Sequence, residues 1–467
     1  MSPRTTPVRF DEARPRALAL ARSAADEGFE VLLVRDVRGR FTLIVDDRDQ
    51  QVEDAQRDRW HAGLVEQLNP YVTGRPLTLA SQMFTADSLL ASRRTVPDAL
   101  RPPGGAGSVR LLENTVVGED WANVSTPTPE ADGTRTHRTA LYGFKGGVGR
   151  TTATAMLARH LVDAGNIVLV VDLDLESPGA GALLAGLDQL PPHGIVDHLV
   201  ESAVGNSDGL DLVTRTPYTP TRGFGELWVA PARGQGSDDT PYAYVDKLNR
   251  VYADIPGASF AHRLATAVQA AEDAVARGDS GRRPDVVLLD SRAGIHDVAA
   301  VTISQLCDLA LLFGADNAQT WAGYGDLFTA WQTSGQAREI REKLRMVASM
   351  VPDTVHHSMD TYLDSFRARA YECFATLYDD VAPDTEQETD SGALPQAPFS
   401  PSLTDDSAPH APIPILFEPG LVGLDAVNSP HWQDRAFVQA AYRDFLAAAA
   451  PLVTTDLGAR GDEEGRR

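Results

Sequence analysis

Hydrophobic residues in the larger, C-terminal part of the chain form short continuous runs that alternate with stretches of helical spacing. An apolar run at 286–289 follows the segment 260–278, and an apolar run within 308–316 precedes the segment 318–333; both of these segments have helical periodicity. Strands that are apolar throughout are typical of parallel sheets covered on both faces. The alternation predicts an α/β domain with a doubly wound, mostly parallel sheet.

The first hundred residues show a different pattern. Residues 30–37 and 40–47 form two strand-like runs joined across Gly39, which predicts a β-hairpin. Helical segments are expected at 17–28 and 51–68, and in the second of these Trp60, Leu64 and Leu68 share one face. No catalytic constellation occurs here. We therefore expect a small N-terminal α+β module that serves docking of a partner or regulation.

Composition suggests where these parts begin and end. Proline- and glycine-rich or polar stretches follow the N-terminal module, and an acidic, proline-rich stretch interrupts the later part of the chain. The expected organisation is a module at 1–110, a linker at 111–137, a nucleotide-binding domain at 138–455 with a disordered insertion at 382–412, and a tail at 456–467.

Charge and cysteine content narrow the classes of function. The formal net charge of −23 disfavours a protein that coats nucleic acid, which needs a basic face to displace counterions from phosphates. The two cysteines, Cys307 and Cys373, form neither a metal motif nor a disulfide framework. No apolar run is long enough for a membrane span, and the N-terminus lacks the apolar core of a secretory signal. We expect a cytoplasmic protein.

A glycine-rich loop marks the centre of the predicted domain. Residues 145–149 have the sequence KGGVG between a short apolar strand and a helix predicted over 151–164. Glycines let successive backbone N–H groups turn toward an anion, and the positive end of the helix dipole lies behind them. The loop is therefore a candidate polyphosphate site.

The loop departs from the ordinary phosphate-loop motif at two positions. Phe144 occupies the place of its first glycine, and Arg150 replaces the lysine that precedes Thr151 and Thr152. Arginine keeps the positive charge and can bind phosphate through two N–H groups, but it is wider than an ammonium.

Acidic residues follow two of the predicted strands. VVDLD at 170–174 places Asp172 and Asp174 one residue apart, and VVLLDSRAG at 286–294 ends its apolar run on Asp290. The carboxyl ends of parallel strands are where α/β sheets build their sites.

Loop, helix and acids together resemble the deviant Walker A loop of the ParA/MinD family of dimeric P-loop ATPases, whose pattern is KGG-x-GK-[ST]. FKGGVGRTT with DLDLESPG is most similar to a bacterial subgroup with an arginine-variant loop, KGGVGR, often found beside other modules in signalling and conflict systems. The resemblance covers about residues 138–320. It implies a P-loop NTPase fold with ATP and Mg²⁺ as cofactors.

The resemblance assigns roles to the loop. Gly146, Gly147, Val148 and Gly149 would form the phosphate cradle. Arg150 would contact the β- and γ-phosphates, Thr151 would ligate Mg²⁺, and Thr152 would contact the α-phosphate. Lys145 is the signature lysine, which in the family reaches the partner's phosphates in an ATP-sandwich homodimer.

It also assigns roles to the acids. Asp174 would position the attacking water, while Asp172 and Asp290 would support Mg²⁺ through water molecules. Gly294 would sense the γ-phosphate through its amide. Lys145, Asp174 and Arg150 are the expected catalytic residues.

The leading hypothesis is an Mg²⁺-ATP-dependent ATPase that acts as a nucleotide-gated homodimer and recruits or releases a protein partner, in a bacterial defence or signalling system. A nucleotide-binding scaffold with little or no hydrolysis is the second hypothesis, because the wider guanidinium of Arg150 can hold phosphate yet fit the transition state poorly. A partition-type ATPase on DNA is a third, disfavoured by the acidic charge. A bacterial tyrosine kinase is a fourth, and the C-terminal sequence lacks the tyrosines usual in that class.

Overall fold

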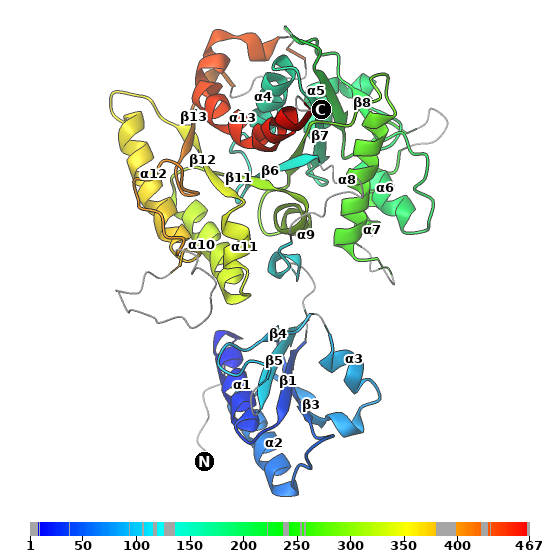
Figure 1. The fold of residues 1–467 in the computed structure, drawn as a ribbon, viewed down its shortest axis with the longest axis vertical. Coiled ribbons are helices and arrows are strands. Elements are labelled where there is room, and N and C mark those ends of the chain that lie inside the picture. The colour runs from blue at the N-terminus through cyan, green and yellow to red at the C-terminus, as the bar shows by residue number, and fades with distance from the viewer. Residues whose placement is uncertain are drawn as a thin grey trace. The chain divides into compact units, whose positions relative to one another are not determined.

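The computed structural model describes residues 8–464 except 9, 37, 93, 105–106, 115–118, 126–135, 222, 237–241, 253–254, 256–257, 380–397, 422–427 and 430, and from 455 onward it describes the backbone alone. The chain divides into two compact units, Met1–Glu119 and Asp120–Arg467 (Figure 1). Most of the segment expected to be a linker, and residues 382–397 of the expected insertion, lie outside the described residues.

The first unit is built on a sheet with the strand order β3-β2-β1-β5-β4. Its strands are β1 (Glu30–Arg35), β2 (Phe41–Asp46), β3 (Val72–Leu79), β4 (Val96–Pro97) and β5 (Ser108–Glu113). The predicted hairpin is confirmed, because β1 pairs antiparallel with β2. The strand β5 pairs parallel with β1, so the first unit continues past residue 110, where the linker was expected to begin. Long-range pairing of this kind leaves no local signal in the sequence.

Helices cover both faces of this sheet. The helices are α1 (Phe10–Ala25), α2 (Asp54–Leu68) and α3 (Ala86–Leu90). Trp60, Leu64 and Leu68 of α2 are buried together with the alanines of α1 against one face, as the helical spacing predicts. Ala86 and Leu90 of α3 join a smaller apolar cluster on the other face.

The second unit contains a sheet with the strand order β13-β12-β11-β6-β10-β7-β9-β8. Its strands are β6 (His137–Gly143), β7 (Ile167–Leu173), β8 (Thr214–Arg215), β9 (Glu226–Ala230), β10 (Val286–Ser291), β11 (Leu309–Gly314), β12 (Leu344–Val351) and β13 (Ile413–Leu416). All neighbouring strands pair parallel except β8, which runs antiparallel to β9 at the edge. The predicted doubly wound, mostly parallel sheet is confirmed.

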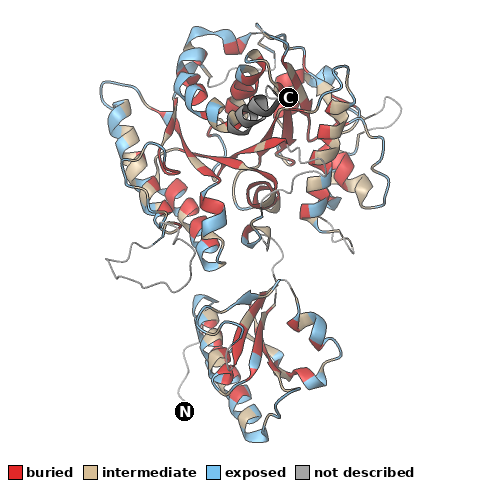
Figure 2. Ribbon diagram, in the orientation of Figure 1, coloured by how far each residue is buried: buried red, intermediate tan, exposed pale blue. Residues whose placement is uncertain are grey.

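Helices enclose this sheet on both sides, and the central strands are buried throughout (Figure 2). The helices are α4 (Arg150–Asp163), α5 (Ala180–Ala185), α6 (Ile195–Ser202), α7 (Tyr244–Val251), α8 (Phe260–Ala276), α9 (Asp297–Val301), α10 (Ala318–Thr333), α11 (Ala337–Arg341), α12 (Met359–Phe374) and α13 (Ala436–Glu464). Side chains of α4, α5 and α13 pack on one face, and those of α6, α8, α9, α10 and α12 pack on the other. Burial on both faces explains why the strands are apolar without alternation.

The C-terminal region differs from the sequence prediction in two places. Residues 398–412, expected to belong to a disordered insertion, are ordered: His410 is fully buried, and the carbonyl of Pro409 accepts a hydrogen bond from the amide of Met346. The local composition is polar, but turns and contacts with the sheet satisfy the backbone. The final helix continues to Glu464, into the segment expected to be a tail.

Within the described residues, no helix combines the length and the apolar character needed to cross a bilayer.

Candidate functional site

The glycine-rich loop connects β6, in the middle of the sheet, to the N-terminus of α4. Gly147 and Gly149 both have φ near +78°, a left-handed conformation that favours glycine. A side-chain carbon at Gly147 would have no atom within 4 Å, so the space beside this glycine is open. Lys145, Gly146 and Gly147 are exposed. The loop therefore presents free backbone at the positive end of a 14-residue helix, which suits an anion.

Arg150 begins α4, but its side chain is buried rather than extended into solvent. The guanidinium donates a short hydrogen bond from Nη1 to the carbonyl oxygen of Ser291, and Nη2 lies 3.7 Å from Oδ2 of Asp174. Arg150 thus joins the loop to the segments that follow β7 and β10. The two contacts use different nitrogens of the planar guanidinium.

Thr151 lies directly beside the acid that ends β10. Its hydroxyl donates to Oδ2 of Asp290 at 2.7 Å, and the hydroxyl of Thr154, one turn along α4, lies 3.4 Å from Oδ1. Asp290 is 1% exposed. The fold thus brings together Thr151 and Asp290, the two residues that the resemblance relates to Mg²⁺.

Asp172 and Asp290 are register partners on the neighbouring parallel strands β7 and β10. Both carboxyls are buried. Burial raises the pKa of Asp172, and the charge of Asp290 raises it further. Burial also raises the pKa of Asp290, opposed by the hydrogen bond from Thr151. Two buried carboxylates side by side favour a proton or a cation between them.

Backbone amides surround the carboxylate of Asp172. It accepts from the amide nitrogens of Gly179 and Ala180, each at 3.0 Å, and from that of Asp174 at 3.2 Å. Asp172 therefore holds the N-terminus of α5 and the turn that contains Asp174. The sequence suggested only a role near the metal and did not reveal this structural one.

Asp174 is closer to the surface. Burial raises the pKa of its carboxyl, and the neighbouring Arg150 opposes that shift. Of the remaining loop residues, Val148 packs in the core below the loop, and a side-chain carbon at Gly143 would lie 3.0 Å from it.

Two predicted residues have partners that the motif does not specify. Lys145 Nζ donates to Oε1 of Gln319, on α10, at 2.8 Å. The amide of Gly294 donates to the carbonyl oxygen of Gly143 at 3.3 Å, so in this conformation it faces the loop's own strand. Each contact joins the loop or the strand before it to a residue far along the chain, Gln319 for Lys145 and Gly294 for Gly143.

The structure adds site residues that sequence reasoning missed. Tyr442, on α13, reaches the start of α4: its hydroxyl lies close to the side chain of Thr152 and 3.7 Å from the position of a side-chain carbon at Gly149. Only its helical spacing with Phe445 was visible in the sequence, and that indicated core packing.

Glu176 connects the segments that follow β7 and β10. It accepts from the hydroxyl of Tyr252 at 2.8 Å, forms an ion pair with Arg292, and lies 3.6 Å from Nε2 of His296. Burial lowers the pKa of His296. Glu176 and Arg292 were each within two residues of a predicted site acid, which was the available signal.

Among the residues that the structure describes, no group of three or more His, Cys, Asp or Glu side chains is arranged to hold a metal ion. A surface cavity of about 520 Å³ lies between the C-terminal part of α4 and α13, lined by residues such as Leu161 and Leu446. It is at the opposite end of α4 from the loop and contains none of the predicted site residues.

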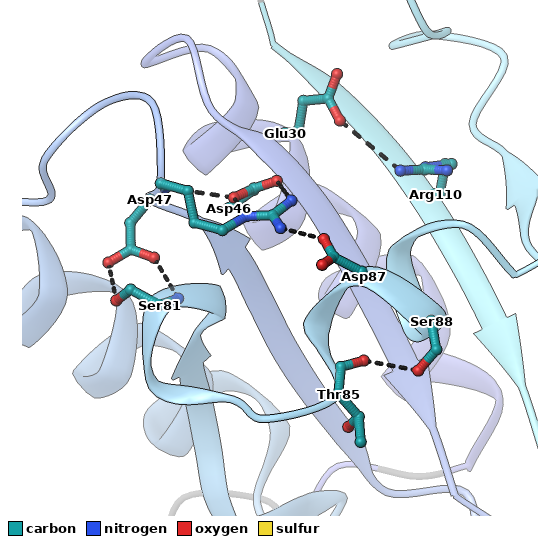
Figure 3. A network of polar contacts seen from close by, with 9 residues as sticks. Glu30, Asp46, Asp47, Ser81, Thr85, Asp87, Ser88 and Arg110 are labelled. Carbon is teal, nitrogen blue, oxygen red and sulfur yellow. Dashed lines mark hydrogen bonds and ion pairs between the residues drawn. The ribbon is translucent and has the colours of Figure 1, made fainter.

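The first unit carries acidic side chains of another kind, at the ends of strands and in α3 (Figure 3). Arg48 pairs with Asp46 and with Asp87, and Asp47 accepts from the amide and hydroxyl of Ser81. Each of these carboxylates has a nearby cation, amide or hydroxyl as its partner, close to the surface. They therefore differ from the buried carboxylates of the second unit.

Comparisons with known proteins agree with this architecture. The family model for the CobQ/CobB/MinD/ParA nucleotide binding domain matches residues 139–381, more than half of the chain. No curated protein matches the sequence.

Solved structures resemble the chain more weakly. A ParA family ATPase from Chlorobium tepidum is 12% identical, with a TM-score of 0.40 over 67% of this chain and 100% of that one. Cobyrinic acid a,c-diamide synthase from Mycobacterium smegmatis, with a bound ATP analog and magnesium, is 20% identical, with a TM-score of 0.35 over 49% and 81%. The MinC:MinD complex of Aquifex aeolicus is 16% identical, with a TM-score of 0.30 over 46% and 68%. By the extent of the domain match, this chain belongs to the CobQ/CobB/MinD/ParA nucleotide-binding family.

Proposed function

We propose that the protein is an Mg²⁺-ATP-binding P-loop ATPase of the deviant Walker A type that acts as a nucleotide-gated homodimer. ATP would lie between two copies, and hydrolysis would release them. The output would be recruitment or release of a protein partner, with the first unit as the docking module, in a bacterial defence or signalling system.

The contact between Thr151 and Asp290 is the observation that carries this proposal. It places a hydroxyl and a buried carboxylate 2.7 Å apart at the start of a helix whose loop is open to an anion. Mg²⁺ is usually bound by one or two carboxylates together with substrate phosphates rather than by an all-protein cage. The residues present therefore fit a metal that arrives with its nucleotide, and bound Mg²⁺ would neutralise charge on the phosphate oxygens.

The chain's own residues would divide the remaining work. The backbone of Gly146, Gly147 and Gly149 would bind phosphate, Thr152 would contact the α-phosphate, and Arg150 would provide the cation of the β- and γ-phosphates. Asp174, at the end of a turn fixed by Asp172, would orient the attacking water.

Lys145 would link dimerisation to hydrolysis. Its ammonium is exposed at the mouth of the loop, where a second copy could be reached. A cation supplied across the dimer stabilises transition-state charge only after assembly, which couples hydrolysis to the dimer.

Nucleotide turnover and molecular mass, measured with and without Mg²⁺-ATP, test the proposal. The wild type should shift from monomer to dimer with ATP. Lys145→Ala should bind ATP but remain monomeric, while Asp174→Ala should dimerise and hydrolyse at least about 100-fold more slowly. A wild type that neither binds ATP nor changes mass would contradict the proposal.

A scaffold with little hydrolysis is the second candidate, and the orientation of Arg150 motivates it. The guanidinium is held by Ser291 and lies near Asp174, the residue that must orient water. Arg150→Lys separates the two functions. We expect roughly 10-fold slower turnover because the two-sided contact is lost; a gain in turnover would favour the scaffold.

A further inference from the structure

Lys145 is held by a neutral side chain of its own protomer. The ammonium donates to the amide oxygen of Gln319 at 2.8 Å, and both side chains are exposed. In the described part of the chain, no carboxylate lies within ion-pair distance of Lys145, although the protein carries 65 acidic residues. The partner of Lys145 is therefore a neutral amide, whereas many other cations in the described part of this chain form ion pairs with carboxylates.

The geometry of α10 brings these two residues together. The ring of Phe144, which precedes Lys145, packs against Gly323, where a side-chain carbon would lie 2.2 Å from the ring. The amide nitrogen of Phe144 also lies 3.4 Å from the hydroxyl of Tyr324, which is bonded to the carbonyl of Phe313. Residues on one helix thus fix the backbone before Lys145 and present Gln319 one turn earlier.

The hydrogen bond between Lys145 and Gln319 is weak enough to break and re-form readily. A hydrogen bond to a charged group is stronger than one between neutral groups when it is shielded from water, and exposed charged contacts contribute much less. A neutral amide also attracts the ammonium less over distance than a carboxylate would. Lys145 is kept in place but can be released to a stronger anion.

We propose that Gln319 is a positioning residue that retains Lys145 on its own protomer and sets the fraction of Lys145 available to a second copy. The proposal rests on the homodimer described above. Binding of Lys145 to the phosphates of the partner's nucleotide would compete with the Gln319 contact, so the strength of that contact tunes the dimer dissociation constant.

Substitutions at Gln319 test this with opposite expected signs. Gln319→Ala should free Lys145 and lower the dimer dissociation constant, measured with Mg²⁺ and a non-hydrolysable ATP analogue, by about 2–5-fold. Gln319→Glu should retain Lys145 as an ion pair and raise the constant by about 2–5-fold, less at 1 M NaCl because salt screens exposed charges. Gln332→Glu, on the exposed part of the same helix, introduces the same charge away from the loop and is the matched control.

Two further measurements make the result specific. In a Lys145→Ala background, the variants with either Gln319 substitution should stay as monomeric as Lys145→Ala alone, because Gln319 then has no ammonium to retain. In the protein without nucleotide, acetylation of Lys145 by a succinimidyl ester, followed by peptide mass spectrometry, should be faster in Gln319→Ala and slower in Gln319→Glu than in the wild type.

Shifts of the same sign, shifts that persist without Lys145, or unchanged acetylation would overturn the inference. If the wild type does not dimerise with ATP, the proposed function fails, and the acetylation rates still decide whether Gln319 holds Lys145.

Discussion

Asp46 in the first unit and Asp290 in the second both lie at the C-terminal end of a strand, yet their carboxylates have opposite surroundings. Asp46 lies near the surface, where the hydrogen bonds from Arg48 lower its pKa. Asp290 is buried beside Asp172, and burial raises its pKa. A strand end is thus not enough to make a site. In the second unit, the acidic groups buried at the sheet outnumber the buried cations beside them. Such an excess of buried negative charge favours the binding of a metal ion together with its nucleotide.

The largest expected difference between Asp290 and Asp46 is in the effect of their substitution on ATP hydrolysis. Asp290→Asn should reduce Mg²⁺-dependent ATP hydrolysis at least about 100-fold, because the neutral amide no longer attracts the proposed Mg²⁺. Asp46→Asn should leave hydrolysis unchanged. Steady-state hydrolysis with far-UV circular dichroism as a folding control provides the measurement. Equal losses in both variants would remove the distinction between the two carboxylates.

The next effect is on folding of the second unit. Asp172→Ala should lower the free energy of unfolding by about 1–3 kcal/mol, because amides at the start of α5 lose their buried acceptor. Asp172→Asn retains one acceptor oxygen and removes the buried charge, so it should cost less. Urea denaturation of both variants gives the comparison. A larger loss for the asparagine variant would show that the charge itself is needed for folding.

The two units should also respond to pH in opposite directions. Asp172 and Asp290 have raised pKa values in the folded state, so without Mg²⁺ and nucleotide their contribution to stability declines as pH rises above about 4 and through those values. Asp46 has a lowered pKa, so its contribution is present above about pH 4 and is lost as pH falls through the lowered value.

Hydrogen exchange on peptides from β10 and β2 can follow the two responses separately in the full chain. Each carboxyl changes stability by at most about 1.4 kcal/mol per pH unit. Addition of Mg²⁺-ATP should weaken the response of β10 and leave that of β2 unaltered. Parallel responses in both units would contradict the proposed difference.

The smallest effect is expected at the surface network of the first unit. Arg48→Ala removes the ion pairs with Asp46 and Asp87 and should lower the free energy of unfolding less than Asp172→Ala does, because exposed pairs are screened by water. Thermal unfolding at low and high salt measures it. A loss of stability larger than that of Asp172→Ala would show that these surface ion pairs contribute substantially to the folding of the first unit.

Local patterns in the sequence were sufficient for much of the architecture. Apolar runs located the central strands, and helical spacing located helices such as α10, because burial on two faces or on one stripe determines which residue types a position accepts. The glycine loop was equally visible, since left-handed backbone at Gly147 and Gly149 favours glycine. Residues 398–412 were misjudged because their order comes from contacts with distant β12 rather than from their own composition.

What the sequence by itself determined is therefore the set of elements and the presence of an anion-binding loop. The tertiary structure decided which side chains meet there: Thr151 with Asp290, Lys145 with Gln319, and Tyr442 with Thr152. Each pair joins residues more than a hundred positions apart. Their meeting depends on the order of strands in the sheet and on which helix covers each strand, and these are set by packing of the whole domain rather than by any local pattern.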